Sequence, residues 1–370
     1  MEFVYRNLTG TGRYVAELTK ELLVLDDRNH YTLFTTSTYG DRPWMGPLGQ
    51  ARFIQTALPW SHKLCEALWL TMDWPPVDRY ITRHDIYHCM SGMAFPARGG
   101  KYLLTVHDLS WQVRPEFYDF RHRGIWRVHH RRVLRRSDHF IAVSQFTKQD
   151  MMEHLQIPAE RITVIPEGVR SSFRVLDPET VKTVRAKYVP PGQYFLVVGD
   201  VAPRKNNVRV VQAFARVKER SREPVSLVFA GPLGFRAQEV VREVRDRKLT
   251  GSVKFLGYTN EDDLVALMNG ATALVFVSLY EGFGLPILEA MACDTPVVTS
   301  KVTSMPEVAG DAALLVEPTS EEEIADAMWQ VLSDESTRRR LVEAGRRRVL
   351  DFTWTEAARR LRDLYERIGR

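Results

Sequence analysis

Two glutamates separated by seven residues, Glu281 and Glu289, lie in a stretch that reads EGFGLPILEAMACDTPVV. The stretch follows an apolar run at residues 273–277, and Pro286 falls where a first helical turn tolerates proline. A strand, a glycine-bearing loop and a helix leave backbone N–H groups available to an anion, while nearby carboxylates accept hydrogen bonds from hydroxyls. The pattern indicates a ligand that combines phosphate with polyol; the alternative is an ordinary turn with two surface glutamates.

Two adjacent cations, Arg204 and Lys205, follow another apolar run at residues 194–198. Arginine can bind two phosphate oxygens at once, lysine supplies a point charge, and the N-terminus of the next helix adds N–H donors. Asn206 is predicted to cap that helix. The pair predicts a diphosphate site, with surface charge on a loop as the alternative.

Polar side chains that follow apolar runs in the N-terminal half are further candidates. His107 and Asp108 come directly after one such run, and their position favours a functional role for His107. For Ser144, a helix cap and a ligand contact are both open. For His88, a structural role and a ligand contact are both open.

These residues can form one site only in a fold that brings the ends of several strands together. Short apolar runs alternate with helical periodicity along 370 residues, a length that fits two domains better than one. The alternation predicts an α/β fold with two doubly wound sheets, and parallel sheets bind ligands at the carboxyl ends of their strands. We expect an N-terminal domain at 1–170, a second domain at 171–350, a ligand in the cleft between them, and a final helix at 351–370.

Composition narrows the class of protein. Hydrophobic residues make up 44% and charged residues 26% of the chain, as in globular proteins. No apolar run approaches the ~20 residues of a membrane span, and MEFVYRNLTG has no signal-peptide core. The three cysteines lack metal-ligand spacing, which favours a reduced, cytoplasmic setting. Because no acidic pair follows an apolar strand as a metal–nucleotide site would require, we predict no essential metal.

The segment from Arg121 to Arg136 contains seven arginines, three histidines and no acid. Its apolar residues fit a helix with one packed side. The segment is either a solvated face or a surface for an anionic membrane, which would give a peripheral location on the inner membrane surface. Nucleic acid is not expected, since no aromatic residues are interleaved in a binding motif.

Motifs along nearly the whole chain resemble those of the retaining GT-B glycosyltransferases of family four, also described as group 1. In family order they are GTGRYVAEL, DIYHC, LLTVHDLSWQVRPEFY, DHFIAVSQFTKQD, ITVIPEGV, VVGDVAPRKN and EGFGLPILEAMACDTPVV. The most specific is the E-x7-E signature of Glu281 and Glu289. The resemblance implies two Rossmann-like domains that face each other across a cleft, and the Arg204-Lys205 pair is most similar to the mannosyltransferase subset.

The resemblance also implies roles on the donor side. Glu289 would hold the ribose hydroxyls of a nucleotide, and Glu281 the hydroxyls of the donor sugar. Arg204 and Lys205 would neutralise the diphosphate. Backbone N–H groups would assist them at Phe283, Gly284 and Leu285.

On the other side, Gly10 and Gly12 would let the first loop approach the phosphates and the acceptor. His107 would contact the donor sugar. The acceptor-side candidates are His88, Asp108 and Ser144. The Trp354-bearing final helix would cross back to the first domain.

Four departures from the family pattern stand out. Asp200 stands where many members carry arginine after the glycine, so the cation pair rests on Arg204 and Lys205. Asp294 occupies a helix end where glycine is usual, at a cost of about 1 kcal/mol or less, because aspartate tolerates the left-handed conformation. Glu167 replaces a usual asparagine, and its role is open. The stretch before Gly10 is shorter than usual, which implies a truncated first strand.

The expected function is therefore metal-independent, retaining transfer of a hexosyl group from a nucleotide-diphosphate sugar, with GDP-mannose as the expected donor. The acceptor would be a glycan or a lipid-linked saccharide, and the nucleotide sugar is a co-substrate, so no cofactor is expected. The alternatives are a transferase that uses UDP-glucose or another UDP-sugar, a non-catalytic GT-B scaffold, and a nucleotide-sugar epimerase.

Overall fold

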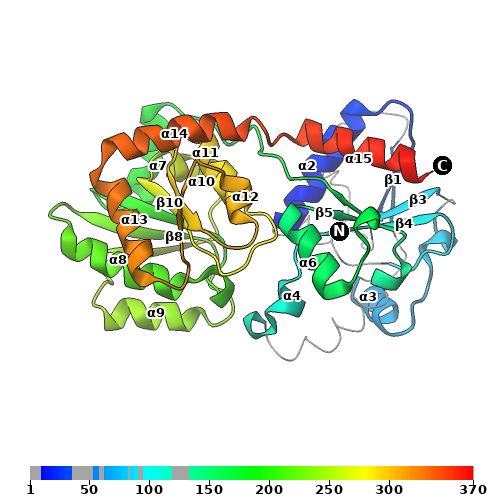
Figure 1. Ribbon diagram of the computed structural model, residues 1–370, viewed down its shortest axis with the longest axis horizontal. Coiled ribbons are helices and arrows are strands. Elements are labelled where there is room, and N and C mark those ends of the chain that lie inside the picture. The colour runs from blue at the N-terminus through cyan, green and yellow to red at the C-terminus, as the bar shows by residue number, and fades with distance from the viewer. Residues whose placement is uncertain are drawn as a thin grey trace. The chain divides into compact units, whose positions relative to one another are not determined.

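The protein was analysed as a computed structural model. The residues that it describes are 10–35, 53–57, 62–81, 84–90, 95–118 and 133–369. The chain divides into two compact units (Figure 1). Unit 1 comprises Met1–Val113, Phe120–Gly168 and Trp354–Arg370, and unit 2 comprises Arg114–Asp119 and Val169–Thr353. The predicted final helix thus belongs to the same unit as the N-terminal half.

Unit 2 is built on a six-stranded parallel sheet. Its strands in spatial order are β12 (Leu314–Val316), β11 (Val297–Ser300), β10 (Ala273–Phe276), β7 (Gln193–Val198), β8 (Val225–Ala230) and β9 (Val253–Gly257). The central strands are buried on both faces, as their continuous apolar runs require.

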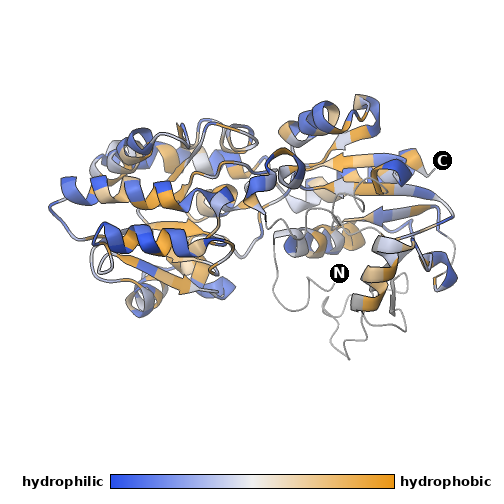
Figure 2. Ribbon diagram, turned by 90° about the horizontal axis from the view of Figure 1, so that it is seen from below, coloured by the Kyte–Doolittle hydropathy of each residue, from blue (hydrophilic) through white to orange (hydrophobic). Residues whose placement is uncertain are grey.

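Helices cover both faces of this sheet (Figure 1). One face shares its core with α8 (Asn207–Arg220), α9 (Ala237–Asp246) and α13 (Glu321–Ser333). The other face carries α7 (Pro178–Tyr188), α10 (Glu261–Asn269), α11 (Leu285–Ala292), α12 (Met305–Ala309) and α14 (Glu335–Val349). Tyr194 on β7 points to that second face, where its hydroxyl donates to the Leu267 carbonyl of α10 at 2.6 Å. Figure 2 shows the apolar strands against helices that are hydrophilic on their outer sides.

Unit 1 contains a four-stranded parallel sheet and a two-stranded parallel sheet among its described residues. The strands are β3 (Ile86–Cys89), β4 (Lys101–Val106), β5 (His139–Ala142), β6 (Ile162–Val164), and the pair β1 (Tyr31–Thr35) and β2 (Phe53–Ala57). The helices are α2 (Gly10–Leu25), α3 (His62–Thr71), α4 (Ser110–Val113), α6 (Gln145–Leu155) and α15 (Trp354–Ile368). Short 3-10 turns lie at Val77–Arg79 and Ala159–Arg161 in unit 1, and at Pro115–Phe117 and Pro203–Lys205 in unit 2.

The first and last described helices of the chain lie side by side (blue and red in Figure 1). Trp354, Leu361 and Leu364 of α15 are buried, as are Leu18 and Leu22 of α2. The side chains expected on one face of the final helix, Trp354, Ala358, Leu361 and Leu364, are therefore all buried.

The predicted α/β fold with parallel sheets is confirmed, but short elements were missed, among them α4, α12 and β12. Helix α12 has five residues and strand β12 has three. Neither is long enough to show a hydrophobic period in the sequence. The strand expected at residues 3–5 lies outside the described residues.

The structure also bears on the predictions for Gly10 and Gly12 and for the basic segment. Gly10 and Gly12 were expected in a turn, but both lie in the first turn of α2, where Gly12 is buried. From Arg121 to Arg136, only residues 133–136 are described; they are helical, and Arg136 forms an ion pair with Asp73. The remainder of the basic segment lies outside the described residues. None of the described helices is long and apolar enough to cross a membrane.

Candidate donor-binding site

The loops that follow β7 and β10 lie next to each other because those strands are neighbours in a parallel sheet. Arg204 and Lys205 belong to the 3-10 turn Pro203–Lys205 after β7. The N–H of Leu279, in the loop after β10, donates to the carbonyl of Arg204 at 2.8 Å. The sheet order therefore brings together the two motifs that the sequence analysis selected separately.

Glu281 is the centre of this arrangement, and its side chain accepts from both cations. Its Oε2 lies 2.6 Å from Nη1 of Arg204, and its Oε1 lies 2.7 Å from Nζ of Lys205. Arg204 also donates to the carbonyl of Tyr280 at 3.0 Å, and Nζ of Lys205 lies 4.5 Å from the centre of the Phe276 ring. Glu281 is buried, with 8% of the residue exposed, and the two cations that flank it are partly buried.

The charges of the cluster fix its ionisation. Burial alone would raise the pKa of Glu281, but the charges of Arg204 and Lys205 lower it to about 2. Burial lowers the pKa of Lys205, and the neighbouring Arg204 adds to this, while Glu281 offsets it only in part. Both shifts are expected when a single carboxylate faces two cations. The cluster retains a net positive charge, which suits an anionic ligand.

Asn206 does not cap α8 in the predicted way. It occupies the cap position in the left-handed conformation, with φ 59°, and its side chain makes no capping hydrogen bond. Its Nδ2 instead donates to the carbonyls of Val277 at 3.1 Å and Pro318 at 2.6 Å. The chain bends sharply between the 3-10 turn and α8, and the Asn206 amide therefore points away from the helix. Its hydrogen bonds connect the loops around the cluster.

Two glycines allow the loops after β7 and β8 to approach each other. Gly199 has φ 111° and Gly231 has φ 159°. A Cβ atom on Gly231 would lie 2.0 Å from the carbonyl oxygen of Gly199, which is far too close. The backbone path beside Arg204 and Lys205 therefore depends on glycine at position 231.

The loop between β10 and α11 has the predicted form. Gly284 precedes α11 in the left-handed region, and Pro286 lies in the first turn. The hydroxyl of Ser304 donates to the carbonyls of Glu281 and Phe283, at 2.9 and 2.8 Å, and so holds the loop. The role of the N–H groups of Phe283, Gly284 and Leu285 as anion donors stays a prediction. Asp294, after α11, is left-handed as predicted, and it pairs with Arg346.

Glu289 lies on α11 and is 3% exposed. It does not join the Glu281 cluster but pairs with Arg170, whose Nη2 lies 2.9 Å from its Oε1. The sequence analysis missed Arg170. A carboxylate on a buried helix face requires a cationic partner, but the sequence offers no sign of which of 51 lysines and arginines supplies it.

In unit 1, the partly buried His107 pairs with the buried Glu167, the residue whose role was open. Nδ1 of His107 lies 3.6 Å from a carboxylate oxygen of Glu167, and Nε2 donates to the carbonyl of Met90 at 2.8 Å. The edge of the imidazole meets the Tyr14 ring, with 4.7 Å between ring centres. Burial alone would lower the pKa of His107, but Glu167 and the Met90 carbonyl raise it above 6.5.

The contacts of the acceptor-side candidates bear on the roles left open. Both ring nitrogens of His88 have partners, the hydroxyls of Tyr365 at 2.6 Å and Thr105 at 2.8 Å, and burial lowers its pKa to about 3. Ser144 caps α6 by accepting from the N–H of Thr147 at 2.9 Å. These contacts favour the structural alternative for His88 and the cap for Ser144. Asp108 accepts from the N–H of Ser110 at 2.9 Å, at the start of α4.

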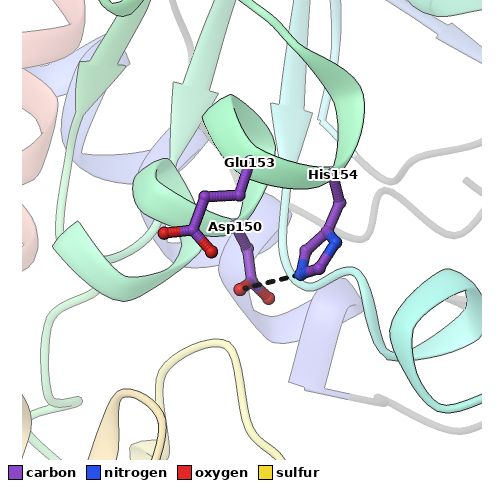
Figure 3. A group of neighbouring side chains, drawn as sticks. All are labelled: Asp150, Glu153 and His154. Atoms are coloured by element: carbon purple, nitrogen blue, oxygen red, sulfur yellow. Dashed lines mark ion pairs between the residues drawn. The ribbon is translucent and has the colours of Figure 1, made fainter.

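A group of potential metal ligands lies on α6, formed by Asp150, Glu153 and His154 (Figure 3). Their ligand atoms all lie within 4.8 Å of one another. Helical spacing alone places residues i, i+3 and i+4 together, and His154 pairs with Asp150 at 3.8 Å. The group gives no ground for assigning a metal, and metal independence stays a prediction.

Two parallel α/β sheets with helices on their faces are typical of the GT-B class of glycosyltransferase, and the arrangement of Arg204, Lys205 and Glu281 suits the anionic donors of that class. The chain belongs to the glycosyl transferases group 1 family, also described as glycosyltransferase family 4. The model of the former matches residues 183–348, and the model of the latter matches residues 8–173. The protein is therefore a glycosyltransferase.

Relatives agree with this assignment, and a solved structure shares the fold. The O-antigen chain mannosyltransferase B of Escherichia coli is 30% identical over 94% of this chain and 93% of its own length. A serotype-specific mannosyltransferase of Escherichia coli is 31% identical over 63% of this chain, which spans 29% of that longer protein. The sucrose-phosphate synthase structure from Thermosynechococcus elongatus superimposes with a TM-score of 0.75 at 23% identity, covering 97% of this chain and 93% of its own, and shows the shared fold.

Proposed function

We propose that this glycosyltransferase transfers a hexosyl group, with retention of configuration and without a metal ion, from a nucleoside-diphosphate sugar, and that GDP-mannose is the donor. A glycan or a lipid-linked saccharide is the acceptor. The mannosyltransferase relatives support the choice of mannose. The donor base, the sugar and the acceptor are the parts of the proposal that need experiment.

One observation carries the proposal: Arg204 and Lys205 are held by Glu281 at the carboxyl ends of neighbouring strands. An ammonium has three N–H donors, and the described contacts of Lys205 use one of them. The cluster can therefore bind a diphosphate without giving up Glu281. Glu281 remains ionised at neutral pH, so it can also accept hydrogen bonds from sugar hydroxyls.

The reaction breaks the bond between the anomeric carbon and the diphosphate oxygen and forms a bond from that carbon to an acceptor oxygen. Negative charge grows on the leaving diphosphate, and preorganised cations stabilise it most in the transition state. In the proposed retaining reaction, the diphosphate leaves and the acceptor oxygen arrives on the same face of the sugar, with the departing phosphate taking the acceptor's proton. Arg204 and Lys205 supply the electrostatic stabilisation.

The test combines ligand binding with turnover. Thermal shift with GDP, UDP and ADP identifies the base, and we expect GDP to give the largest stabilisation. Lys205→Ala should lose transfer by roughly a hundredfold or more, since a preorganised charge is removed from the leaving group. Circular dichroism should show that the variant keeps its fold.

Lys182→Ala is the matched control, because the Lys182 side chain is 76% exposed and lies on the surface of α7. It should transfer at the wild-type rate. Normal turnover of Lys205→Ala would overturn the diphosphate assignment. A larger shift with UDP would replace GDP-mannose by a UDP-sugar, and donor conversion without acceptor would indicate an epimerase.

A further inference from the structure

Arg170 is a buried cation for which the reaction outlined above has no role. It follows Val169, whose N–H donates to the carbonyl of Phe352 at 3.0 Å, so the backbone at this point is tied to the end of unit 2. The Arg170 side chain is almost fully buried, with 7% of the residue exposed. Burying a guanidinium is costly unless its charge and its N–H groups are matched.

Two carboxylates from different helices match the two ends of the guanidinium. Nη2 donates to Oε1 of Glu289 on α11 at 2.9 Å, and Nη1 donates to Glu261 at the start of α10. The Phe173 ring lies against the guanidinium, with its centre 4.7 Å from Cζ. Ser172 donates to the other oxygen of Glu261 at 2.5 Å, so Glu261 is itself held in place. Burial lowers the pKa of Arg170, but the two carboxylates more than offset this, so it stays charged.

Only one oxygen of the Glu289 carboxylate accepts a hydrogen bond from the described residues. Arg170 uses Oε1, and among the described residues no hydrogen bond to Oε2 is found. Since the guanidinium is planar and anchored at its far end by Glu261, it fixes both the position and the rotation of the Glu289 carboxylate. A fixed carboxylate with one oxygen available is suited to accept from neighbouring hydroxyls on a ring.

We propose that Arg170 is a positioning residue of the nucleotide site, which holds Glu289 in the orientation that accepts the ribose hydroxyls of the donor. The proposal rests on the proposed function, because it takes Glu289 as the ribose contact. Glu261 anchors Arg170 and does not itself contact the nucleotide. If Arg170 were only a structural ion pair, its loss would weaken the binding of every nucleoside diphosphate equally.

The experiment compares two ligands that differ only in the ribose hydroxyls. Calorimetry measures the affinity of the full-length protein for GDP and for 2′,3′-dideoxy-GDP, or for the UDP or ADP pair where thermal shift shows that base to bind best. Hydrogen bonds to a charged group predict that the wild type prefers the ribonucleotide by roughly ten- to a hundredfold. Arg170→Met should reduce this preference to less than about threefold, with the affinity for the dideoxy ligand little changed.

Three further variants make the result specific. Arg174→Met is the matched control, because Arg174 is an exposed arginine four residues away and should keep the full preference. Arg170→Lys keeps the charge but lacks the planar fork that fixes the rotation of the Glu289 carboxylate, so it should retain part of the preference. Glu289→Gln should lose the preference, and adding Arg170→Met to it should cause no further loss.

Each outcome decides the proposal. A full ribose preference in Arg170→Met, or an equal loss of both ligands, overturns the positioning role while leaving the proposed function intact. A wild type that binds no nucleoside diphosphate, or binds the two ligands equally, overturns the ribose assignment of Glu289 together with the inference. If Arg170→Met does not fold, the Arg170→Lys comparison decides in its place, and an unchanged preference there counts against the proposal.

Discussion

Glu167, Glu281 and Glu289 are buried carboxylates, and each faces a cationic or titratable side chain of its own unit. Removing one partner from such a pair leaves a buried group uncompensated, which costs more than the pair contributes when intact. Single substitutions at these positions should therefore have effects that are large and specific to the partner.

The pair of His107 and Glu167 makes a measurable prediction about pH. Because the pKa of His107 is raised in the folded state, the protonated form stabilises the fold; this contribution is fully present below pH 6.5 and is lost as the pH rises through the folded pKa. Glu167→Gln removes the main cause of the rise, so the pKa of His107 should fall. Its stability deficit relative to wild type should be largest below pH 6.5.

Titration of the histidine ring protons by NMR checks this prediction directly, with urea unfolding at several pH values as the second measurement. Glu160→Gln, on the exposed 3-10 turn Ala159–Arg161, is the control and should leave His107 unchanged. An unaltered His107 titration in Glu167→Gln would show that the carboxylate does not set its pKa.

At the scale of elements, the candidate donor-binding loops depend on how closely the loop after β7 and the loop after β8 can approach each other. Gly231→Ala would place a methyl group against the Gly199 carbonyl, at a backbone conformation that other residues rarely adopt. We expect a loss of stability of about 1–3 kcal/mol, as for an overpacked site, and weaker nucleotide binding, because the turn that carries Arg204 and Lys205 must shift.

Urea unfolding and calorimetry measure the two effects. Gly251→Ala is the appropriate control, because nothing lies within 4 Å of its added Cβ and its φ is not in the left-handed region. If Gly231→Ala unfolds at the wild-type midpoint and binds nucleotide normally, the close approach of the two loops is not required.

At the scale of the whole molecule, the C-terminal helix completes the unit formed by the N-terminal half. Helix α15 buries Trp354, Leu361 and Leu364, and Tyr365 forms a hydrogen bond with the partly buried His88. Burying each large apolar side chain contributes about 1.5–3 kcal/mol, so their combined loss is comparable with the typical stability of a domain. A chain that ends at Thr353 should therefore lose the cooperative unfolding of unit 1 and retain that of unit 2.

Hydrogen exchange resolved by mass spectrometry measures both units in one experiment. Amides of β4 and β5 should lose protection in the shortened chain, whereas those of β7 and β8 should keep it. A chain shortened only after Ile368 serves as the control. Full protection of β4 and β5 without α15 would show that unit 1 does not need the helix.

Local features of the sequence determined much of the fold and the choice of candidate site residues. The parallel α/β fold follows from the alternation of apolar runs and helical periods, and Arg204, Lys205, Glu281 and Glu289 were selected because each lies at the end of a run or in the first turns of a helix. The left-handed Asp294 and the first-turn Pro286 were also predicted, since a single residue's conformational preference decides them.

The tertiary structure alone decided which of these side chains meet. Arg170 and Glu289 are 119 residues apart in the chain, and nothing local in either segment indicates the other. The same holds for Glu167 beside His107 and for Asn206, whose amide bonds to carbonyls from two distant loops instead of capping α8. The physical reason is that buried charges and amides take whichever partners the packing of distant segments supplies. The sequence therefore selected the candidate residues of the donor site, and the fold assigned them their neighbours.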